Sequence, residues 1–78
     1  MRGRPDWMNR TDDRILELLA GSGLICSPDV VAINLQASER WVSRRLSRLR
    51  DAGFVEAVDE DYYAVTDEGE AYLSRRGR

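Results

Sequence analysis

Arginine is concentrated in residues 38–50, which hold five arginines and one acid in a chain of 78 residues with a net charge of −2. The guanidinium group presents five N–H donors in a fixed fork, which suits bidentate contact with phosphate oxygens or with the acceptor edge of guanine. A basic stretch on an acidic chain favours a localised binding surface over general attraction to polyanions. These residues therefore predict a surface that recognises a nucleic acid.

Taken as a helix, residues 38–50 have an apolar face and a basic face. Val42, Leu46 and Leu49 recur at i, i+4 and i+7, which is the spacing of a stripe that packs on a domain. The remaining surface offers charge and hydrogen-bond donors, as a helix in a DNA major groove does. The predicted DNA-binding residues are Ser38, Arg40, Trp41, Ser43, Arg44, Arg45, Ser47 and Arg48.

Two kinds of contact are expected from this surface. Arg40 and Arg44 lie about a turn apart in the N-terminal half, which usually reaches base edges. An arginine–guanine contact there gives about 1–3 kcal/mol of discrimination. Ser43, Arg45 and Arg48 are expected to hold phosphates, which sets position rather than sequence.

A solvated arginine face is the alternative interpretation, with intrahelical pairs to Glu39 or Asp51 worth about 0.2–0.5 kcal/mol. Trp41 has two equal interpretations: contact with a sugar or a thymine methyl, or packing against the preceding helix or the hairpin. The helix-turn-helix context described next favours nucleic-acid contact for the arginines.

The segment before residue 38 predicts a helix that positions the basic one. Ser27-Pro28-Asp29 combines a capping hydroxyl, a proline in the first turn and an acid, and the helix is expected to run to about Leu35. Only Gln36 and Ala37 then precede Ser38, which is expected to cap the basic helix. Two helices joined by so short a turn form a helix-turn-helix.

The flanking segments complete the predicted fold. Thr11 is expected to cap a first helix that ends at Gly21-Ser22-Gly23. Residues 54–58 and 62–66 are β-branched and aromatic and predict a hairpin, and a short helix follows from residue 66. The predicted fold class is α+β, mostly α: a winged helix-turn-helix with three helices, a β-hairpin wing and a short C-terminal helix. Residues 1–10 are expected to form an N-terminal arm, and residues 11–78 the DNA-binding domain.

Several motifs, in order, carry a family resemblance. They are Pro5-Asp6-Trp7-Met8, Asp12-Asp13-Arg14-Ile15-Leu16-Glu17, Ser27-Pro28, Val42-Ser43-Arg44-Arg45 and Thr66-Asp67-Glu68-Gly69-Glu70-Ala71-Tyr72-Leu73. Together they resemble the haloarchaeal phage-repressor-like winged-helix proteins over nearly the whole chain. The resemblance implies a small archaeal DNA-binding transcriptional regulator. A halophilic source fits the acidic, lysine-free composition.

The chain also departs from the pattern of that family. Glu39 and Arg40 follow the Ser38 cap, where a small polar residue is usual, and Gln36 stands where glycine is common in the turn. The wing tip, residues 59–61, is fully acidic and would repel phosphate. We expect it to be a solvated loop that stays off the DNA, or else to face a protein.

Other candidate residues have a structural interpretation that is favoured over a functional one. Arg2-Gly3-Arg4-Pro5 contains the core of an AT-hook, so Arg2 and Arg4 could enter a minor groove, but an ordinary flexible terminus is favoured. Cys26 is expected to be a small apolar filler rather than a redox sensor. Core and edge packing is favoured over a ligand pocket or dimer seam for Trp7, Tyr62, Tyr63 and Tyr72, and only one of Tyr62 and Tyr63 can be deeply buried.

The composition argues against several classes of function. Without histidine, a phosphate-cradling glycine loop or a second cysteine, no enzyme, cofactor, metal or small-molecule ligand is expected. No apolar run could cross a membrane, so a cytoplasmic protein is predicted. We expect sequence-specific binding of double-stranded DNA by a homodimeric transcriptional regulator, with repression favoured. The alternative is an acidic winged-helix protein–protein interaction module in a transcription or replication complex.

Overall fold

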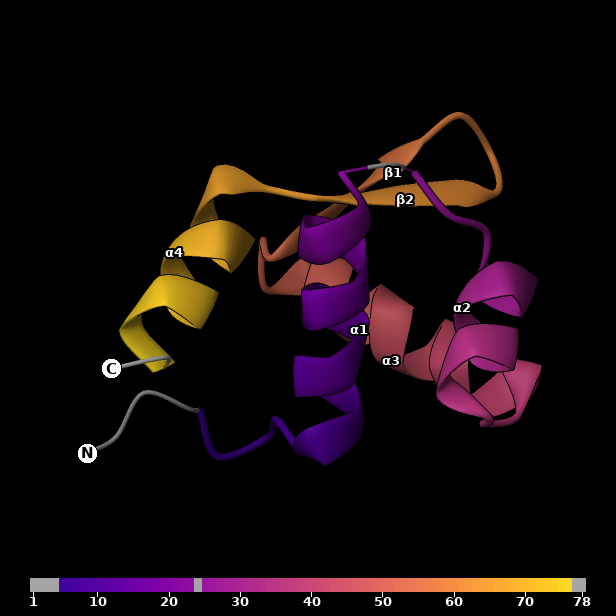
Figure 1. The fold of residues 1–78 in the computed structure, drawn as a ribbon, viewed down its shortest axis with the longest axis horizontal. Coiled ribbons are helices and arrows are strands. Elements are labelled where there is room, and N and C mark those ends of the chain that lie inside the picture. The colour runs from indigo at the N-terminus through magenta and orange to yellow at the C-terminus, as the bar shows by residue number, and fades with distance from the viewer. Residues whose placement is uncertain (1–4, 24, 77–78) are drawn as a thin grey trace.

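The computed structural model describes residues 5–23 and 25–76, which form four helices and a two-stranded antiparallel hairpin (Figure 1). In chain order the elements are α1 (Arg10–Ser22), α2 (Pro28–Leu35), α3 (Glu39–Asp51), β1 (Val55–Val58), β2 (Tyr62–Val65) and α4 (Asp67–Arg76). The predicted fold class, a mostly helical winged helix, is confirmed.

The first helix begins with a cap that the sequence analysis misplaced. Asn9, not Thr11, is the N-cap: its side-chain oxygen accepts from the backbone N–H of Asp12 at 3.2 Å. The carboxylate of Asp12 in turn accepts from the backbone N–H of Asn9 at 2.9 Å. This reciprocal capping box satisfies two N–H groups at once, so the helix starts at Arg10 and Thr11 lies within its first turn.

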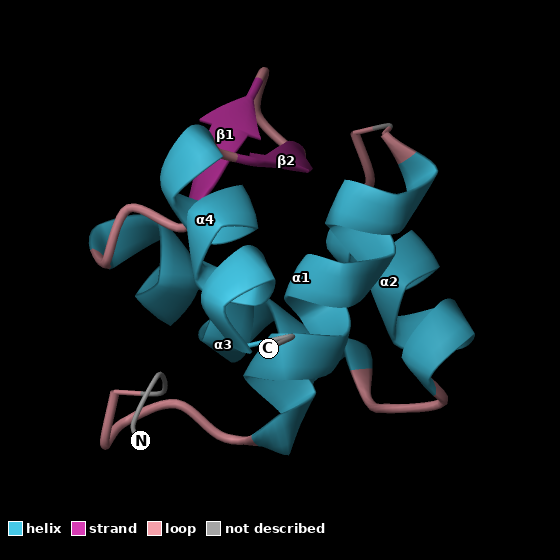
Figure 2. Ribbon diagram, turned by 60° about the vertical axis from the view of Figure 1, so that its left-hand side comes forward, coloured by secondary structure: helices cyan, strands magenta, loops and turns pink. Residues whose placement is uncertain are grey.

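One hydrophobic core holds the elements together. Figure 1 shows α1 between α2 and α4, with α3 packed behind it and the wing above. In Figure 2, the view turned by 60°, α1 again lies between α2 and α4. The predicted stripe of Val42, Leu46 and Leu49 is fully buried. Trp7 and Met8, which the sequence placed in the arm, also pack here, and Met8 is buried. The core residues are Met8, Ile15, Leu16, Leu19, Val31, Ala32, Leu35, Val42, Leu46, Leu49, Phe54, Val55 and Tyr72.

The second helix begins where predicted but is not capped as predicted. Ser27 is the N-cap residue and Pro28 the first helical residue. The hydroxyl of Ser27, however, makes no capping bond to the helix and instead donates to the carboxylate of Asp29. Proline needs no N–H acceptor at this position and its φ suits a helix, so the start is well defined without the hydroxyl.

The turn between α2 and α3 uses a left-handed residue. Gln36, the C-cap of α2, has φ 58° and ψ 45°, a conformation in which glycine has no Cβ penalty. The next N–H, of Ala37, returns to the carbonyl of Ala32 at 3.0 Å. Ser38 then caps α3 as predicted, accepting from the N–H of Trp41 at 3.0 Å.

The wing includes a backbone pairing that the sequence did not reveal. Strands β1 and β2 pair in the register Val55↔Val65 to Val58↔Tyr62. Cys26 adds an isolated bridge to Tyr63, with N–H···O bonds of 3.0 Å and 2.8 Å in the two directions. The segment entering α2 is therefore tied to the wing through Cys26, which is half-buried.

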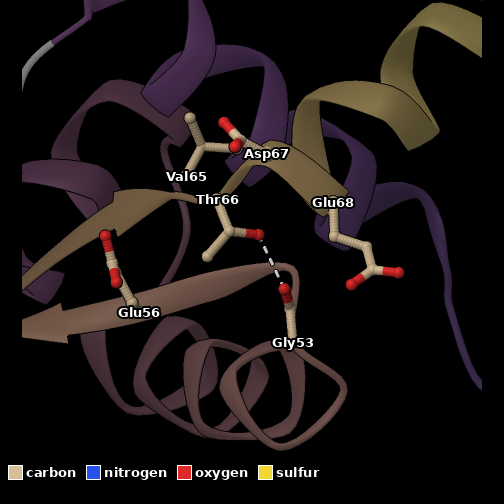
Figure 3. Close-up of a pocket in the computed structure, with 6 residues that line it drawn as sticks. All are labelled: Gly53, Glu56, Val65, Thr66, Asp67 and Glu68. Atoms are coloured by element: carbon tan, nitrogen blue, oxygen red, sulfur yellow. Dashed lines mark hydrogen bonds between the residues drawn. The ribbon is translucent and has the colours of Figure 1, made fainter.

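The last helix is joined to the rest of the fold at Thr66 and Gly69. The hydroxyl of Thr66 donates to the carbonyl of Gly53 at 2.6 Å and accepts from the N–H of Gly69 at 3.1 Å. Figure 3 shows the first of these bonds beside a hollow between the end of α3 and the start of α4. A Cβ on Gly69 would lie 2.3 Å from the carbonyl oxygen of Phe54, so the close approach requires glycine here.

Candidate nucleic-acid interface

The predicted DNA-binding residues follow one another along α3 and the turn before it. Because Val42, Leu46 and Leu49 turn inward, the residues between them turn outward. Exposed side chains belong to Ser38, Arg40, Trp41, Arg44, Ser47 and Arg48, whereas Ser43 and Arg45 are half-buried. The arginines predicted to bind DNA thus differ in solvent exposure: Arg40, Arg44 and Arg48 are exposed, and Arg45 is half-buried.

Arg45 is engaged inside the protein. Its Nε donates to Oδ1 of Asp12 at 2.8 Å, and its Nη2 donates to Oδ2 of Asp12 at 2.6 Å and to the carbonyl oxygen of Trp7 at 3.0 Å. The Asp12 side chain is 0% exposed and that of Arg45 is 16% exposed. Hydrogen bonding to Asp12 raises the pKa of the Arg45 guanidinium above its ordinary value. This fork is occupied by an internal carboxylate, which favours a positioning role over the predicted phosphate contact.

The N-terminal segment rests on the C-terminal half of α3. The Cζ of Arg48 lies 4.4 Å from the ring centroid of Trp7, and that of Arg45 lies 5.9 Å from it. The Trp7 ring stacks on Phe54, with centroids 6.3 Å apart, and Phe54 packs on Tyr72 with centroids 5.5 Å apart. Guanidinium groups at such distances from an aromatic face are attracted by its quadrupole.

Trp41 contacts the start of α1, a partner that the sequence did not suggest. Its indole Nε1 donates to the hydroxyl of Thr11 at 3.3 Å, and the Cζ of Arg45 lies 5.4 Å from its ring centroid. Its hydrogen bond is therefore with the start of α1, and its cation–π contact is within its own helix. The side chain remains 38% exposed, so part of the ring still faces outward.

The acids of the first turn of α1 have tertiary partners that sequence reasoning missed. Asp13 accepts from the hydroxyl of Tyr72 at 2.6 Å, and both Asp12 and Asp13 are buried. A signal was present for Asp12, because it precedes Ile15 and Leu19 at i+3 and i+7 and so lies on the apolar stripe. A carboxylate on a core-facing stripe needs a buried partner, because an unpaired buried charge is costly.

The opposite side of α3 borders an acidic groove beside the wing. Ser27, Pro28, Asp29, Glu39, Ser43, Asp61 and Tyr62 line this groove. Three of these residues carry carboxylates and none is an arginine. The hydroxyl of Ser27 lowers the pKa of Asp29, which keeps that carboxylate ionised to lower pH. Phosphate is therefore disfavoured on the wing side of the helix, in line with the expectation for the acidic wing tip.

The remaining predictions are less constrained by the structure. Arg2 and Arg4 lie outside the described residues, so their minor-groove role stays a prediction, as does the division at residue 10. Residues 5–23 and 25–76 contain no group of three or more potential metal ligands of the His, Cys, Asp or Glu type. Within the same ranges, no helix has the length and apolar character needed to cross a membrane.

Comparison with known proteins finds relatives among phage repressors and repressor-like proteins. Residues 1–76 match the model of the winged helix-turn-helix phage repressor family. The repressor protein of Halobacterium phage phiH is 38% identical over 78 residues, covering 95% of this chain and 88% of that protein. The crystal structure of the PhiH1 repressor-like protein from Haloarcula marismortui superposes with a TM-score of 0.84 at 37% identity, over 95% of this chain and 85% of that one.

The fold extends to a larger protein as well. The reduced form of MarR from E. coli gives a TM-score of 0.80 at 21% identity, over 91% of this chain and 52% of the MarR chain. At this identity the likeness concerns the fold alone. It independently identifies the helices and the hairpin as a winged helix.

Proposed function

Because the chain belongs to the winged helix-turn-helix phage repressor family, as its motifs predicted, we propose that it binds double-stranded DNA sequence-specifically and represses transcription. In this proposal α3 enters the major groove. The supporting observation is the outward arginine surface of α3, on a helix whose opposite face is fully buried and whose start is capped and joined to α2 by a tight turn. The name of the phage phiH relative, a repressor protein, supports repression in particular.

The exposed arginines differ in their proposed roles along the helix. Arg40 and Arg44, in the N-terminal half, are proposed to read base edges, where a bidentate arginine prefers guanine. Arg48 and Ser47, further along, are proposed to hold phosphates. Ser43 lines the acidic groove, so it is proposed to face that groove rather than a phosphate. Arg45 is proposed to fix the angle of α3 against α1 rather than to touch DNA, because its fork is on Asp12.

A homodimer is proposed as the binding form. A domain of this size reads only a short half-site, and two-fold related copies would read two half-sites spaced by the helical repeat of DNA. Occupancy of such a pair would block transcription sterically.

A second candidate function is favoured by the acidic groove. Asp29, Glu39 and Asp61 would attract a basic protein segment rather than DNA. Under this alternative the chain is a protein–protein interaction module in a transcription or replication complex. Binding to duplex DNA separates the two candidates directly.

The experiment is fluorescence anisotropy on duplex DNA from upstream of its own coding region, against a scrambled duplex, across a salt series. We expect preference for the first duplex and weakening as salt rises, because arginine–phosphate contacts release counterions. Arg44→Ala should weaken binding by about fivefold or more, given about 1–3 kcal/mol for a bidentate base contact. Arg75→Ala, which removes an exposed arginine on α4, is the matched control and should change little. Absence of binding to both duplexes at low salt would contradict the proposal and favour the protein-interaction module.

A further inference from the structure

We propose that Trp7 is a positioning residue that holds Arg48 of α3 in place for a DNA phosphate, an inference that rests on the proposed DNA-binding function. The Cζ of Arg48 lies 4.4 Å from the Trp7 ring centroid, which is closer than either contact made by Arg45 with a tryptophan ring. The segment before α1 thereby becomes part of the recognition surface. The sequence placed that surface on α3 and the turn before it, and assigned Trp7 no DNA-binding role.

Trp7 is itself fixed from two directions. Its carbonyl oxygen accepts from Nη2 of Arg45 at 3.0 Å, and Arg45 is anchored by the buried carboxylate of Asp12. Its ring stacks on Phe54, which packs on the fully buried Tyr72. A ring held through both its backbone and its face is a rigid platform.

The platform orders Arg48 without using its hydrogen-bond donors. The described partner of Arg48 is an aromatic ring and not a hydrogen-bond acceptor, so its N–H groups stay available to phosphate oxygens. An arginine side chain has considerable rotamer freedom. If it is ordered before binding, less conformational entropy is lost when it contacts DNA. Arg44 provides the contrast: it is exposed, and the described residues offer it no hydrogen bond, ion pair or aromatic ring.

A double-mutant cycle on DNA affinity tests the inference. Trp7→Leu should weaken binding to the upstream duplex about two- to fivefold, the equivalent of a cation–π contact at an exposed site. In an Arg48→Ala background the same change should have almost no further effect on affinity. In an Arg44→Ala background its full effect should remain, which makes Arg44 the matched control. Trp7→Tyr, which keeps an aromatic face, should restore most of the affinity.

The thermal unfolding midpoint of each variant separates positioning from folding. Trp7→Leu should lower the midpoint by a similar amount in both arginine backgrounds, while its effect on affinity differs between them. An equal loss of affinity in the two backgrounds, with tight binding by the wild type, would overturn the positioning role and leave the proposed function standing. Failure of the wild type to bind any duplex at low salt would instead overturn the proposed function, and this inference with it.

Discussion

The two flanks of α3 carry opposite kinds of electrostatics. On one flank, toward α1 and the N-terminal segment, Arg45 meets the fully buried Asp12 in a two-pronged ion pair. On the other, toward the wing, the carboxylates of Asp29, Glu39 and Asp61 border an open groove. The charge of a residue therefore does not indicate its role, because a cation of the basic helix lies inside and the acids beside that helix face solvent.

The difference in solvent access predicts a difference in energy. Breaking a buried ion pair leaves a desolvated charge behind, whereas an exposed charge is screened by water and salt. The flank toward α1, called the inner flank, should therefore govern the stability of the fold. The flank toward the wing, called the outer flank, should modulate DNA affinity. Four substitutions test this difference between the two flanks.

Arg45→Ala should produce the largest effect. The carboxylate of Asp12 would stay buried without its guanidinium, and we expect the free energy of unfolding to fall by about 3–5 kcal/mol. Urea unfolding followed by far-ultraviolet circular dichroism measures this loss. Arg44→Ala, one residue earlier but exposed, should stay within about 0.5 kcal/mol of the wild type. Equal stabilities for the two variants would remove the distinction between the flanks.

Tyr72→Phe should produce the next largest effect on the inner side. It removes the hydroxyl that donates to the buried carboxylate of Asp13 at 2.6 Å while keeping the ring packed on Phe54. A hydrogen bond to a charged group is worth about 1.5–3 kcal/mol, so we expect a loss of that size in the same unfolding assay. An unchanged midpoint would show that Asp13 does not depend on this donor.

Asp61→Asn should act on DNA affinity rather than on stability. Removing one acid from the groove should raise affinity for a scrambled duplex by up to about fivefold, since exposed charges interact by about 0.2–1 kcal/mol. Glu70→Gln removes an exposed acid from α4 and is the control in the same anisotropy assay. If both variants gain the same affinity for DNA, the change in net charge explains the result, and the position of Asp61 in the groove does not.

Ser27→Ala should produce the smallest effect, which acts through the titration of Asp29. The hydroxyl lowers the pKa of Asp29, so its loss should move that pKa back upward, which carboxyl-carbon NMR across a pH series measures. A carboxylate whose pKa is lower in the folded than in the unfolded state stabilises the fold at pH values above the unfolded-state pKa. This stabilisation is lost as the pH falls through the folded-state pKa. The wild type should therefore be slightly more stable to unfolding than the variant at neutral pH, and this difference should disappear in acid. Ser74→Ala, on α4, should leave the Asp29 titration unchanged.

The sequence predicted the elements well because their signals are local. The stripe of Val42, Leu46 and Leu49 and the Ser38 cap each involve residues within two turns of one another, and the structure confirms both. The cap of α1 was missed because Thr11 and Asn9 both have capping side chains, and the choice depended on the reciprocal bond with Asp12. The predicted site residues on α3 remain predictions as DNA contacts.

Local sequence patterns specify which residues form helices, which face of each helix is apolar, and that α3 presents arginines on its other face. Which of those charges stay outside depends on how the helices pack together. Arg45 and Asp12 are 33 residues apart and Tyr72 and Asp13 are 59 apart, so no local pattern pairs them. They meet because burying the apolar stripes brings α1, α3 and α4 together, and a charge carried into that interior is stable only with an opposite or hydrogen-bonding partner.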